Sequence, residues 1–372
     1  MADLFKNLYS KQFFNVFTEA LEIVIKDFDK TRFLNQIYAS EWEELELKQR
    51  MFHISETLAQ YLSDKYTESI EQLHKIIATL KSIGVKERVK YPDLVFMLIP
   101  HYIETHGLND FDTSVKAIKK ITSFTTCEFA VRPFIIKYGD KMMQEHLRWA
   151  HDEDEHVRRL ASEGCRSRLP LGMAIRDFKF DPSPVIPILE VLKDDPSEYV
   201  RKSVANNLND ISKDNPQVTI DIVKRWKGHS KETDWIVKHA SRTLLKAGNQ
   251  EMMQLFGYGS IDNIEIQNFE IKTNPVRVGE SLEFIFDINN QSASNELIRL
   301  EYAIYFLKKN GTHTKKVFKI SEKNYAPHST TNINRKQSFK PVSTRKYHMG
   351  EHLISIIING VEVEEGSFEL KP

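Results

Sequence analysis

Residues 194–210 read DDPSEYVRKSVANNLND, and this stretch decides the fold that we predict for most of the chain. Its acidic start leads into a valine followed by a basic residue, Val200-Arg201, and then into apolar residues at helical spacing. Acidic residues ahead of a helix favour the positive end of the helix dipole. The stretch therefore predicts a loop that leads into an amphipathic helix.

Three other segments carry the same pair of a valine and a basic residue: Ser114-Val115-Lys116, His156-Val157-Arg158 and Ile236-Val237-Lys238. The valines of the four segments lie 42, 43 and 37 residues apart. HEAT and armadillo repeats recur at about 40 to 47 residues, because one helix pair cannot bury its apolar face without a neighbour. We expect each pair to enter the second helix of its unit. The result would be an α-helical HEAT-like repeat solenoid with a concave surface.

The pattern changes near residue 260, where apolar and polar residues begin to alternate as they do in half-buried strands. Asn310-Gly311 and Asn359-Gly360 stand between apolar runs and are typical of hairpin turns. Strands are predicted at residues 282–288, 301–306 and 354–358. We expect about seven or eight short strands in a small immunoglobulin-like β-sandwich. The predicted domains are residues 1–259 and residues 260–372.

Length and composition describe a folded chain of two ordinary domains, with 372 residues of which 41% are hydrophobic and 28% charged. No segment approaches the roughly 18 apolar residues of a membrane-spanning helix. Met1 to Phe17 lacks the features of a signal peptide. Two cysteines, Cys127 and Cys165, favour a reducing compartment over a disulfide framework. We expect a cytoplasmic protein without a membrane partner.

The formal net charge is zero, which by itself argues against a nucleic-acid partner. The arginines are unevenly distributed, however. Five of them lie within residues 158–176, namely Arg158, Arg159, Arg166, Arg168 and Arg176. Such a cluster can bind phosphate, although a solvated helix face explains any single arginine equally well. His151 and His156 lack metal-binding spacing, and no glycine-rich phosphate loop occurs, so neither a metal nor a cofactor is predicted.

Three acidic residues fall on, or just after, the second helix of successive predicted repeats: Glu128, Glu163 and Asp210. Neighbouring repeats would bring the three carboxylates towards one groove. Carboxylates repel phosphate, so a plain DNA-binding surface has no use for them beside an arginine cluster. In a basic groove they would suit chemistry on a developing cation. The residues alone leave a purely structural role open.

Two longer strings carry a resemblance to a known family. Residues 157–170 read VRRLASEGCRSRLP, and residues 199–210 read YVRKSVANNLND. Both resemble the AlkC group of bacterial DNA alkylation-repair glycosylases, which is related to the AlkD group. Some AlkC proteins also carry a C-terminal immunoglobulin-like domain, and residues 261–372 match that domain in place and size.

The resemblance implies an enzyme that removes 3-methyladenine and 3-methylcytosine from double-stranded DNA by cutting the N-glycosidic bond. The family's catalytic acids correspond to Glu163, Glu128 and Asp210. We expect Glu163 to be the main electrostatic group or water activator, with the other two assisting, and we expect the enzyme to act without drawing the base into a deep pocket. Phosphates would be held by Arg159, Arg166, Arg168, Lys202 and Arg242. The chain is expected to act as a monomer.

One departure from the family string bears on activity. The string usually ends Arg-Pro-Arg-Leu-Pro-Trp, whereas this chain has Ser167 for the first proline and Leu171 for the tryptophan. The missing indole would contact the deoxyribose of the lesion, a contact worth roughly 0.5 to 2 kcal/mol. The rate and the substrate range are therefore in doubt. Trp149, Trp226 and Trp235 are the candidates to replace it.

Two other interpretations stay open at this stage. The chain could be a non-catalytic HEAT-repeat scaffold that binds DNA or a protein, or a protein-interaction solenoid with an adhesion-like β domain. Retention of all three acids favours an enzyme, and the arginine cluster speaks against the interaction solenoid. The β domain could contact the duplex through Lys308, Lys309, Lys315 and Lys316, or these lysines could be solvated residues of an exposed hairpin.

Overall fold

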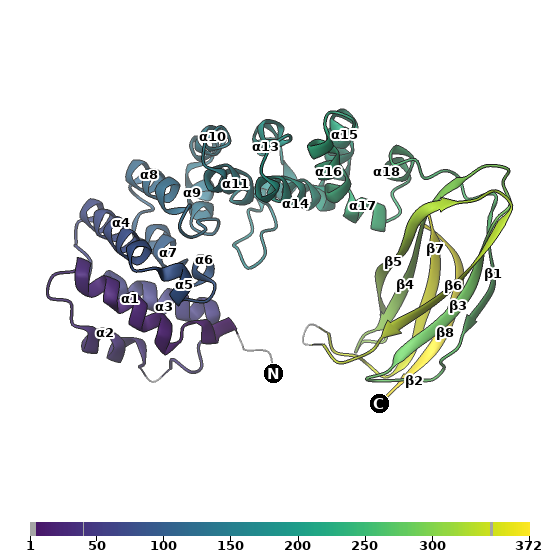
Figure 1. Ribbon diagram of the computed structural model, residues 1–372, viewed down its shortest axis with the longest axis horizontal. Coiled ribbons are helices and arrows are strands. Elements are labelled where there is room, and N and C mark those ends of the chain that lie inside the picture. Colours follow the sequence, from purple (N-terminus) through teal and green to yellow (C-terminus); the bar gives the residue numbers. More distant parts are fainter. Residues whose placement is uncertain (1–4, 40, 343–344) are drawn as a thin grey trace. The chain divides into compact units, whose positions relative to one another are not determined.

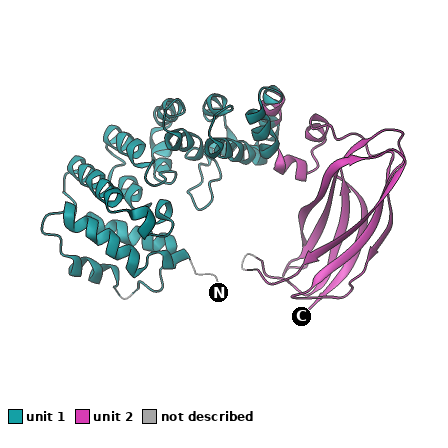
Figure 2. Ribbon diagram, viewed as in Figure 1, with its two compact units in different colours: residues 1–219, 225–240 teal, residues 220–224, 241–372 magenta. Residues whose placement is uncertain are grey.

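The computed structural model describes residues 5–39, 41–342 and 345–372 (Figure 1). It divides into two compact units, drawn in different colours in Figure 2. Unit 1 comprises residues 1–219 and 225–240, and unit 2 comprises residues 220–224 and 241–372. None of the described helices combines the length and the apolar run that crossing a lipid bilayer requires.

The first part of the chain is helical, and Figure 1 labels most of its elements. The elements are η1 (Phe5–Leu8), α1 (Lys11–Val24), α2 (Lys30–Ile37), α3 (Leu47–Ala59), α4 (Tyr66–Ser82), α5 (Val85–Arg88), α6 (Pro92–Val95), α7 (Leu98–His106), α8 (Phe111–Ile121), α9 (Val131–Tyr138), α10 (Asp140–Trp149), α11 (Glu155–Glu163), α12 (Asp177–Phe180), α13 (Ile186–Leu192), α14 (Glu198–Asp214), α15 (Pro216–Trp226), α16 (Lys231–Ala240), α17 (Arg242–Lys246) and α18 (Gln250–Leu255). Helices α11, α14 and α16 pack side by side, while α10 packs on α11 and α13 packs on α14.

The repeated pair of a valine and a basic residue has a structural explanation in two of the repeats. Val157 and Val200 are buried in the first turns of α11 and α14. Arg158 donates from Nη1 to the carbonyl oxygens of Asp152 and Glu153, at 3.0 and 2.8 Å. Arg201 makes the same two contacts with the carbonyl oxygens of the loop before α14, both at 2.8 Å. The basic residue thus ties each helix start to its preceding loop.

The pair at residues 236–238 does not fit this scheme. Val237 is the seventh residue of α16, which begins at Lys231, whereas Val157 is the third residue of α11. The prediction that this pair enters a helix is therefore wrong. Helix α16 begins only 33 residues after α14, and the later place of the valine in α16 brings the spacing of the valines to 37.

Unit 2 contains the β domain, whose strands are β1 (Ile264–Ile271), β2 (Val276–Arg277), β3 (Ser281–Asn290), β4 (Glu296–Leu307), β5 (His313–Tyr325), β6 (Ser329–Ser338), β7 (Gly350–Ile358) and β8 (Val361–Lys371). They form a three-stranded sheet in the order β1-β3-β6 and a five-stranded sheet in the order β2-β8-β7-β4-β5. Only the β2–β8 pair, among the described strands, is parallel. Both predicted asparagine-glycine turns join antiparallel neighbours, β4 to β5 and β7 to β8.

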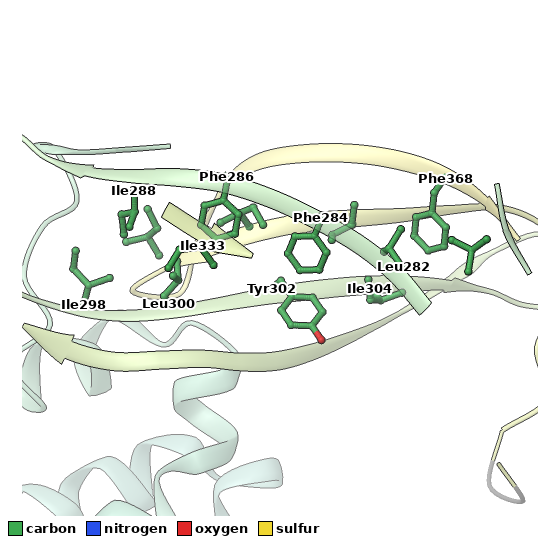
Figure 3. Packing of buried hydrophobic residues seen from close by; sticks show 14 of the residues in the cluster. Leu282, Phe284, Phe286, Ile288, Ile298, Leu300, Tyr302, Ile304, Ile333 and Phe368 are labelled. Carbon is green, nitrogen blue, oxygen red and sulfur yellow. The ribbon is translucent and has the colours of Figure 1, made fainter. Parts of the chain in front are cut away.

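The interior of the sandwich follows from the alternation in β3. Its residues alternate between half-buried and buried along the whole strand. In Figure 3, side chains of β3 face those of β4, and Phe284 meets Tyr302 edge to face with ring centres 5.1 Å apart. The predicted fold class, a helical part followed by an immunoglobulin-like β domain, is confirmed. The boundary predicted between residues 259 and 260 stays a prediction.

The turn between β7 and β8 packs against the segment before α18. The backbones of Gly360 and Gly248 are in direct contact there. A Cβ on Gly360 would lie 2.5 Å from the Cα of Gly248, and both residues have positive φ. We expect Gly360→Ala to destabilise unit 2 by about 2 to 5 kcal/mol, since a left-handed alanine costs about 1 to 2 and overpacking about 1 to 3.

The matched control is Gly311→Ala in the turn between β4 and β5, where φ is also positive but nothing lies within 4 Å of the added Cβ. It should cost only the backbone contribution, about 1 to 2 kcal/mol. Urea denaturation of both variants measures the difference. Equal losses of stability would show that the Gly248 contact does not constrain this turn.

Candidate active site

The three predicted acids come from three separate segments of unit 1. Glu128 lies between α8 and α9, Glu163 is the last residue of α11, and Asp210 lies in α14. Helices α11 and α14 pack directly against each other (Figure 1). Glu163 and Asp210 are almost fully buried, with 6% and 2% of their surface exposed.

Two arginines join these acids into one continuous row of alternating charges. Arg159 contacts the carboxylate of Glu128 at 2.5 Å and that of Glu163 at 3.6 Å. Arg166 contacts Glu163 at 2.6 Å and Asp210 at 2.7 Å. The order is therefore Glu128, Arg159, Glu163, Arg166 and Asp210, and we call these five residues the charge row.

The carboxylates of the charge row differ in how many of their oxygens are engaged. Both arginine contacts of Glu163 use Oε1. In Glu128, Oε2 accepts from Arg159 and from the hydroxyl of Thr126. In Asp210, Oδ2 accepts from Arg166 and Oδ1 accepts from Lys213 at 2.9 Å. Asp210 is therefore held through both oxygens and is the most firmly anchored of the three acids.

The arginines of the charge row are held in their charged form. Burial acts to lower the pKa of Arg159, but the negative charges of Glu128 and Glu163 outweigh burial and raise that pKa above its usual value. The pKa of Arg166 is raised in the same way, with burial opposed by Glu163 and Asp210. Such strongly coupled pairs fix the geometry of the carboxylates that they bind.

Tyr199, in the first turn of α14, is a residue beside the charge row that the sequence did not single out. The guanidinium of Arg159 lies 5.0 Å from the centre of its ring, within the range of a cation–π contact. Burial raises the pKa of its hydroxyl, although 42% of the residue remains exposed. The residues that precede the valine in the other three segments are Ser114, His156 and Ile236. A tyrosine at this position was therefore the one feature of the sequence that could have indicated the contact.

Residues 164–173, which we call the 164–173 loop, follow α11 and are pinned at both ends by Arg132 of α9. This fully buried guanidinium donates from Nη1 to the carbonyl oxygen of Gly164 at 2.9 Å and from Nε to that of Met173. Burial lowers the pKa of Arg132 to about 10. Within the loop, Arg168 makes a two-point contact with Asp214. The backbone of the loop is thus tied to two neighbouring helices.

Leu171, which stands where the family has tryptophan, lies in this loop and projects into solvent. Its side chain is 71% exposed, and its backbone has a φ of +61°, a value that residues with a side chain rarely adopt. Trp149 and Trp226 are buried in the core, so neither presents a ring to a ligand. Trp235 is partly exposed on α16 and stacks on His239. Of the three candidates, only Trp235 has exposed ring surface.

The predicted phosphate-binding residues fall into three groups. Arg159 and Arg166 are members of the charge row, so their guanidiniums already face carboxylates. Arg168 and Lys202 are more exposed and pair with Asp214 and with Glu198, the latter at 2.8 Å. Arg242 begins α17 and belongs to unit 2. Among the lysines of the β domain, Lys315 pairs with Glu362. Their roles in DNA binding stay predictions.

His146 of α10 is buried against α11, and we expect it to make the stability of unit 1 depend on pH. Its Nδ1 donates to the carbonyl oxygen of Ala161 in α11 at 2.9 Å, and burial lowers its pKa from 6.5 to about 4. The unfolded chain therefore binds this proton more tightly. We expect about 3 kcal/mol of stability to be lost as the pH falls from about 6.5 to about 4.

His146→Asn keeps an N–H group that can donate to the same carbonyl but has no titrating ring. Urea denaturation at pH 7 and pH 4.5 should show a smaller loss of stability in this variant than in the wild type. The same loss in both proteins would exclude His146 as the source of the pH dependence.

The part of the chain that the structure describes offers neither a reactive cysteine nor a metal site. Cys165 is buried beside Glu163, its thiol donates to the carbonyl oxygen of Ala161 at 3.2 Å, and burial raises its pKa to about 12. A thiol in this state is a packing group and not a nucleophile. No three His, Cys, Asp or Glu side chains among the described residues gather in a way that would hold a metal ion.

Comparisons with known proteins agree with this architecture. A model of the DNA alkylation repair enzyme family matches residues 94–244, and a model of the C-terminal immunoglobulin-like domain of the uncharacterised protein YhaZ matches residues 265–372. The chain is 42% identical over 370 residues to the uncharacterized protein YhaZ of Bacillus subtilis (strain 168), and the match covers all of both chains. It is 31% identical to the alkylpurine DNA glycosylase AlkC of Pseudomonas fluorescens, solved bound to DNA containing an abasic site analog, with a TM-score of 0.92 and full coverage of both chains.

The fold and the comparisons together define the class: a DNA alkylation repair enzyme with a helical domain and a C-terminal immunoglobulin-like domain. Within that class, the chain belongs to the AlkC family. The predicted family is thereby confirmed, whereas the roles of the individual site residues stay predictions.

Proposed function

We propose that this protein is a DNA glycosylase that hydrolyses the N-glycosidic bond of small cationic alkylated bases, 3-methyladenine and 3-methylcytosine, in double-stranded DNA. The observation that carries the proposal is the charge row, in which three carboxylates from separate segments are joined by two arginines. The AlkC relative is an alkylpurine DNA glycosylase, which supports the same reaction class. We further propose that residues 1–259 carry the activity, that the protein works as a monomer, and that it acts in the cytoplasm.

The proposed reaction begins with a good leaving group. Methylation at N3 gives the base a positive charge, so the base departs with the electrons of the C1′–N bond and needs no general acid. Positive charge then develops on the deoxyribose, and a fixed carboxylate stabilises it. Water adds to C1′, and its proton passes to a carboxylate or to solvent. Because the sugar and not the base is stabilised, the base need not enter a deep pocket.

The engagement of each oxygen suggests how the three acids share this task. Glu163 is bound through Oε1, so we assign its Oε2 to the sugar cation or the attacking water. Glu128 is bound through Oε2 and assists with Oε1. Asp210 has both oxygens engaged, so we assign it to stabilising the cation through the position of Arg166.

The arginines of the charge row reduce the repulsion between its carboxylates and the phosphates of DNA. Three unpaired acids would repel the phosphates of the DNA, whereas paired acids carry little net charge at a distance. We propose that Arg159 and Arg166 serve the phosphates and the acids together, and that Arg168, Lys202 and Arg242 contact the backbone on either side of the lesion. Lys308, Lys309, Lys315 and Lys316 are the proposed contacts of the β domain.

Incubation of the protein with DNA treated by a methylating agent tests the proposal. Released bases are separated by chromatography, and 3-methyladenine and 3-methylcytosine are expected among them. Binding to an abasic-site duplex is measured in parallel. A protein that binds this duplex but releases no base would be the non-catalytic scaffold, the alternative that Leu171 in place of the family tryptophan supports.

A further inference from the structure

Lys48, in the first turn of α3, lies outside the charge row but contacts two of the segments that carry it. Its Nζ donates to the carbonyl oxygen of Leu171 at 2.9 Å. The same ammonium lies 5.1 Å from the centre of the ring of Phe129. Phe129 follows Glu128 in the chain, and Leu171 belongs to the 164–173 loop that carries Arg166. One side chain therefore links the segment of the first acid to the loop of the second arginine.

Lys48 makes a further contact within its own helix. Its ammonium lies 5.4 Å from the ring centre of Phe52, one turn further along α3. The ring of Phe52 stacks on His101 of α7 with centres 4.0 Å apart and planes 14° from parallel. A half-buried lysine held between two aromatic rings loses the mobility of an ordinary surface lysine. The contact to Leu171 is thus supported by two helices, α3 and α7.

Leu171 is the residue of the 164–173 loop at which a stabilising contact matters most, because its backbone conformation is unfavourable. The backbone there adopts the left-handed conformation with a side chain attached, which is unfavourable in isolation. The side chain is largely exposed, so packing of the leucine cannot compensate. Arg132 fixes the loop at Gly164 and Met173, and Lys48 fixes the strained residue between them.

We propose that Lys48 is a positioning residue of the active site, which holds the 164–173 loop and the segment of Glu128 at the spacing that the charge row requires. The inference rests on the proposed function, because its principal readout is base release. It assigns the N-terminal helices a part in the reaction. Displacement of the loop would move Arg166 and, through it, the carboxylates of Glu163 and Asp210.

The test compares Lys48→Met, which keeps the length of the stem but removes the charge and the donor, with Lys48→Arg, which keeps both. Lys48→Met is expected to lower kcat for base release about tenfold and to change KM less than about twofold, as for a misplaced catalytic group. Lys48→Arg should recover kcat to within about threefold. Lys65→Met removes an exposed lysine that pairs with Glu68 near the start of α4, and it should leave both constants unchanged.

A second readout does not depend on activity. Trypsin cleaves after Arg168, and the rate of this cut in the folded protein reports how often the 164–173 loop opens. Lys48→Met should accelerate the cut about fivefold or more, and Lys65→Met should not. If the wild type released no base, the proposed function would fail, while this readout would still decide whether Lys48 holds the loop.

Two results would overturn the proposal. A rise of KM that grows with salt at unchanged kcat would make Lys48 a phosphate contact instead of a positioning residue. Unchanged kcat together with an unchanged rate of cleavage would show that the loop keeps its place without Lys48.

Discussion

Glu163→Gln is expected to lower the rate of base release by about 10²- to 10³-fold, the effect of removing one preorganised electrostatic group from an active site. Glutamine has the shape of glutamate, and its carbonyl oxygen can still accept from Arg159 and Arg166 where Oε1 does now. The negative charge is lost, and the position of Oε2 becomes an NH2 group that donates instead of accepting. The variant should therefore fold normally and bind DNA as tightly as the wild type or more tightly, since one phosphate-repelling charge is gone.

Single-turnover release of 3-methyladenine measures the rate, and titration of an abasic-site duplex measures binding. The matched control is Glu198→Gln on α14, which removes an equally charged but exposed carboxylate that pairs with Lys202. Its rate should stay within about twofold of the wild type. Full activity in Glu163→Gln would remove the central residue from the proposed mechanism, whereas equal losses in both variants would point to a general charge effect.

Arg166→Met is expected to destabilise unit 1 by about 3 to 5 kcal/mol, the usual consequence of leaving a buried charge without its partner. Arg166 lies between Glu163 and Asp210, and both of these carboxylates are almost fully buried. Its removal leaves Glu163 with the more distant Arg159 and Asp210 with Lys213 alone. The loss should be seen as an earlier midpoint in urea denaturation followed by helical circular dichroism.

Arg168→Met is the matched control, two residues along the same loop. Arg168 makes a geometrically similar contact with Asp214, but its side chain is 38% exposed. An exposed pair contributes at most about 1 kcal/mol, so the control should lose no more than that. Equal losses of stability in the two variants would show that burial of the ion pairs does not determine how much Arg166 contributes to stability.

Much of the architecture could be predicted from local patterns in the sequence. Alternation in β3 and the Asn359-Gly360 turn identified the β domain, because a period of two and a positive φ leave strong local signals. The helical part followed from the spacing of Val157 and Val200. The pair at Val237 misled, because the same two residue types fit the middle of a helix as well as its start.

The contacts of the candidate site could be predicted only in outline. Repeat spacing indicated that Glu163 and Asp210 come from neighbouring helices, yet it could not show that Arg166 stands between them. That arrangement depends on the reach of side chains across the packed helices α11 and α14. The contact of Lys48 could not be predicted either, because it joins two residues that are 123 positions apart in the chain.

The charge row also limits which substitutions the chain can accept during evolution. Replacing an acid removes one of the two partners of an arginine, and replacing an arginine removes a partner from two acids, so single steps away from the row disturb more than one ion pair. Descendants that abandon the chemistry should consequently lose these residues as a set, while those that keep it should inherit the five together. A homologue that lacks one residue of the charge row would be expected to carry a compensating substitution at the residue that paired with it.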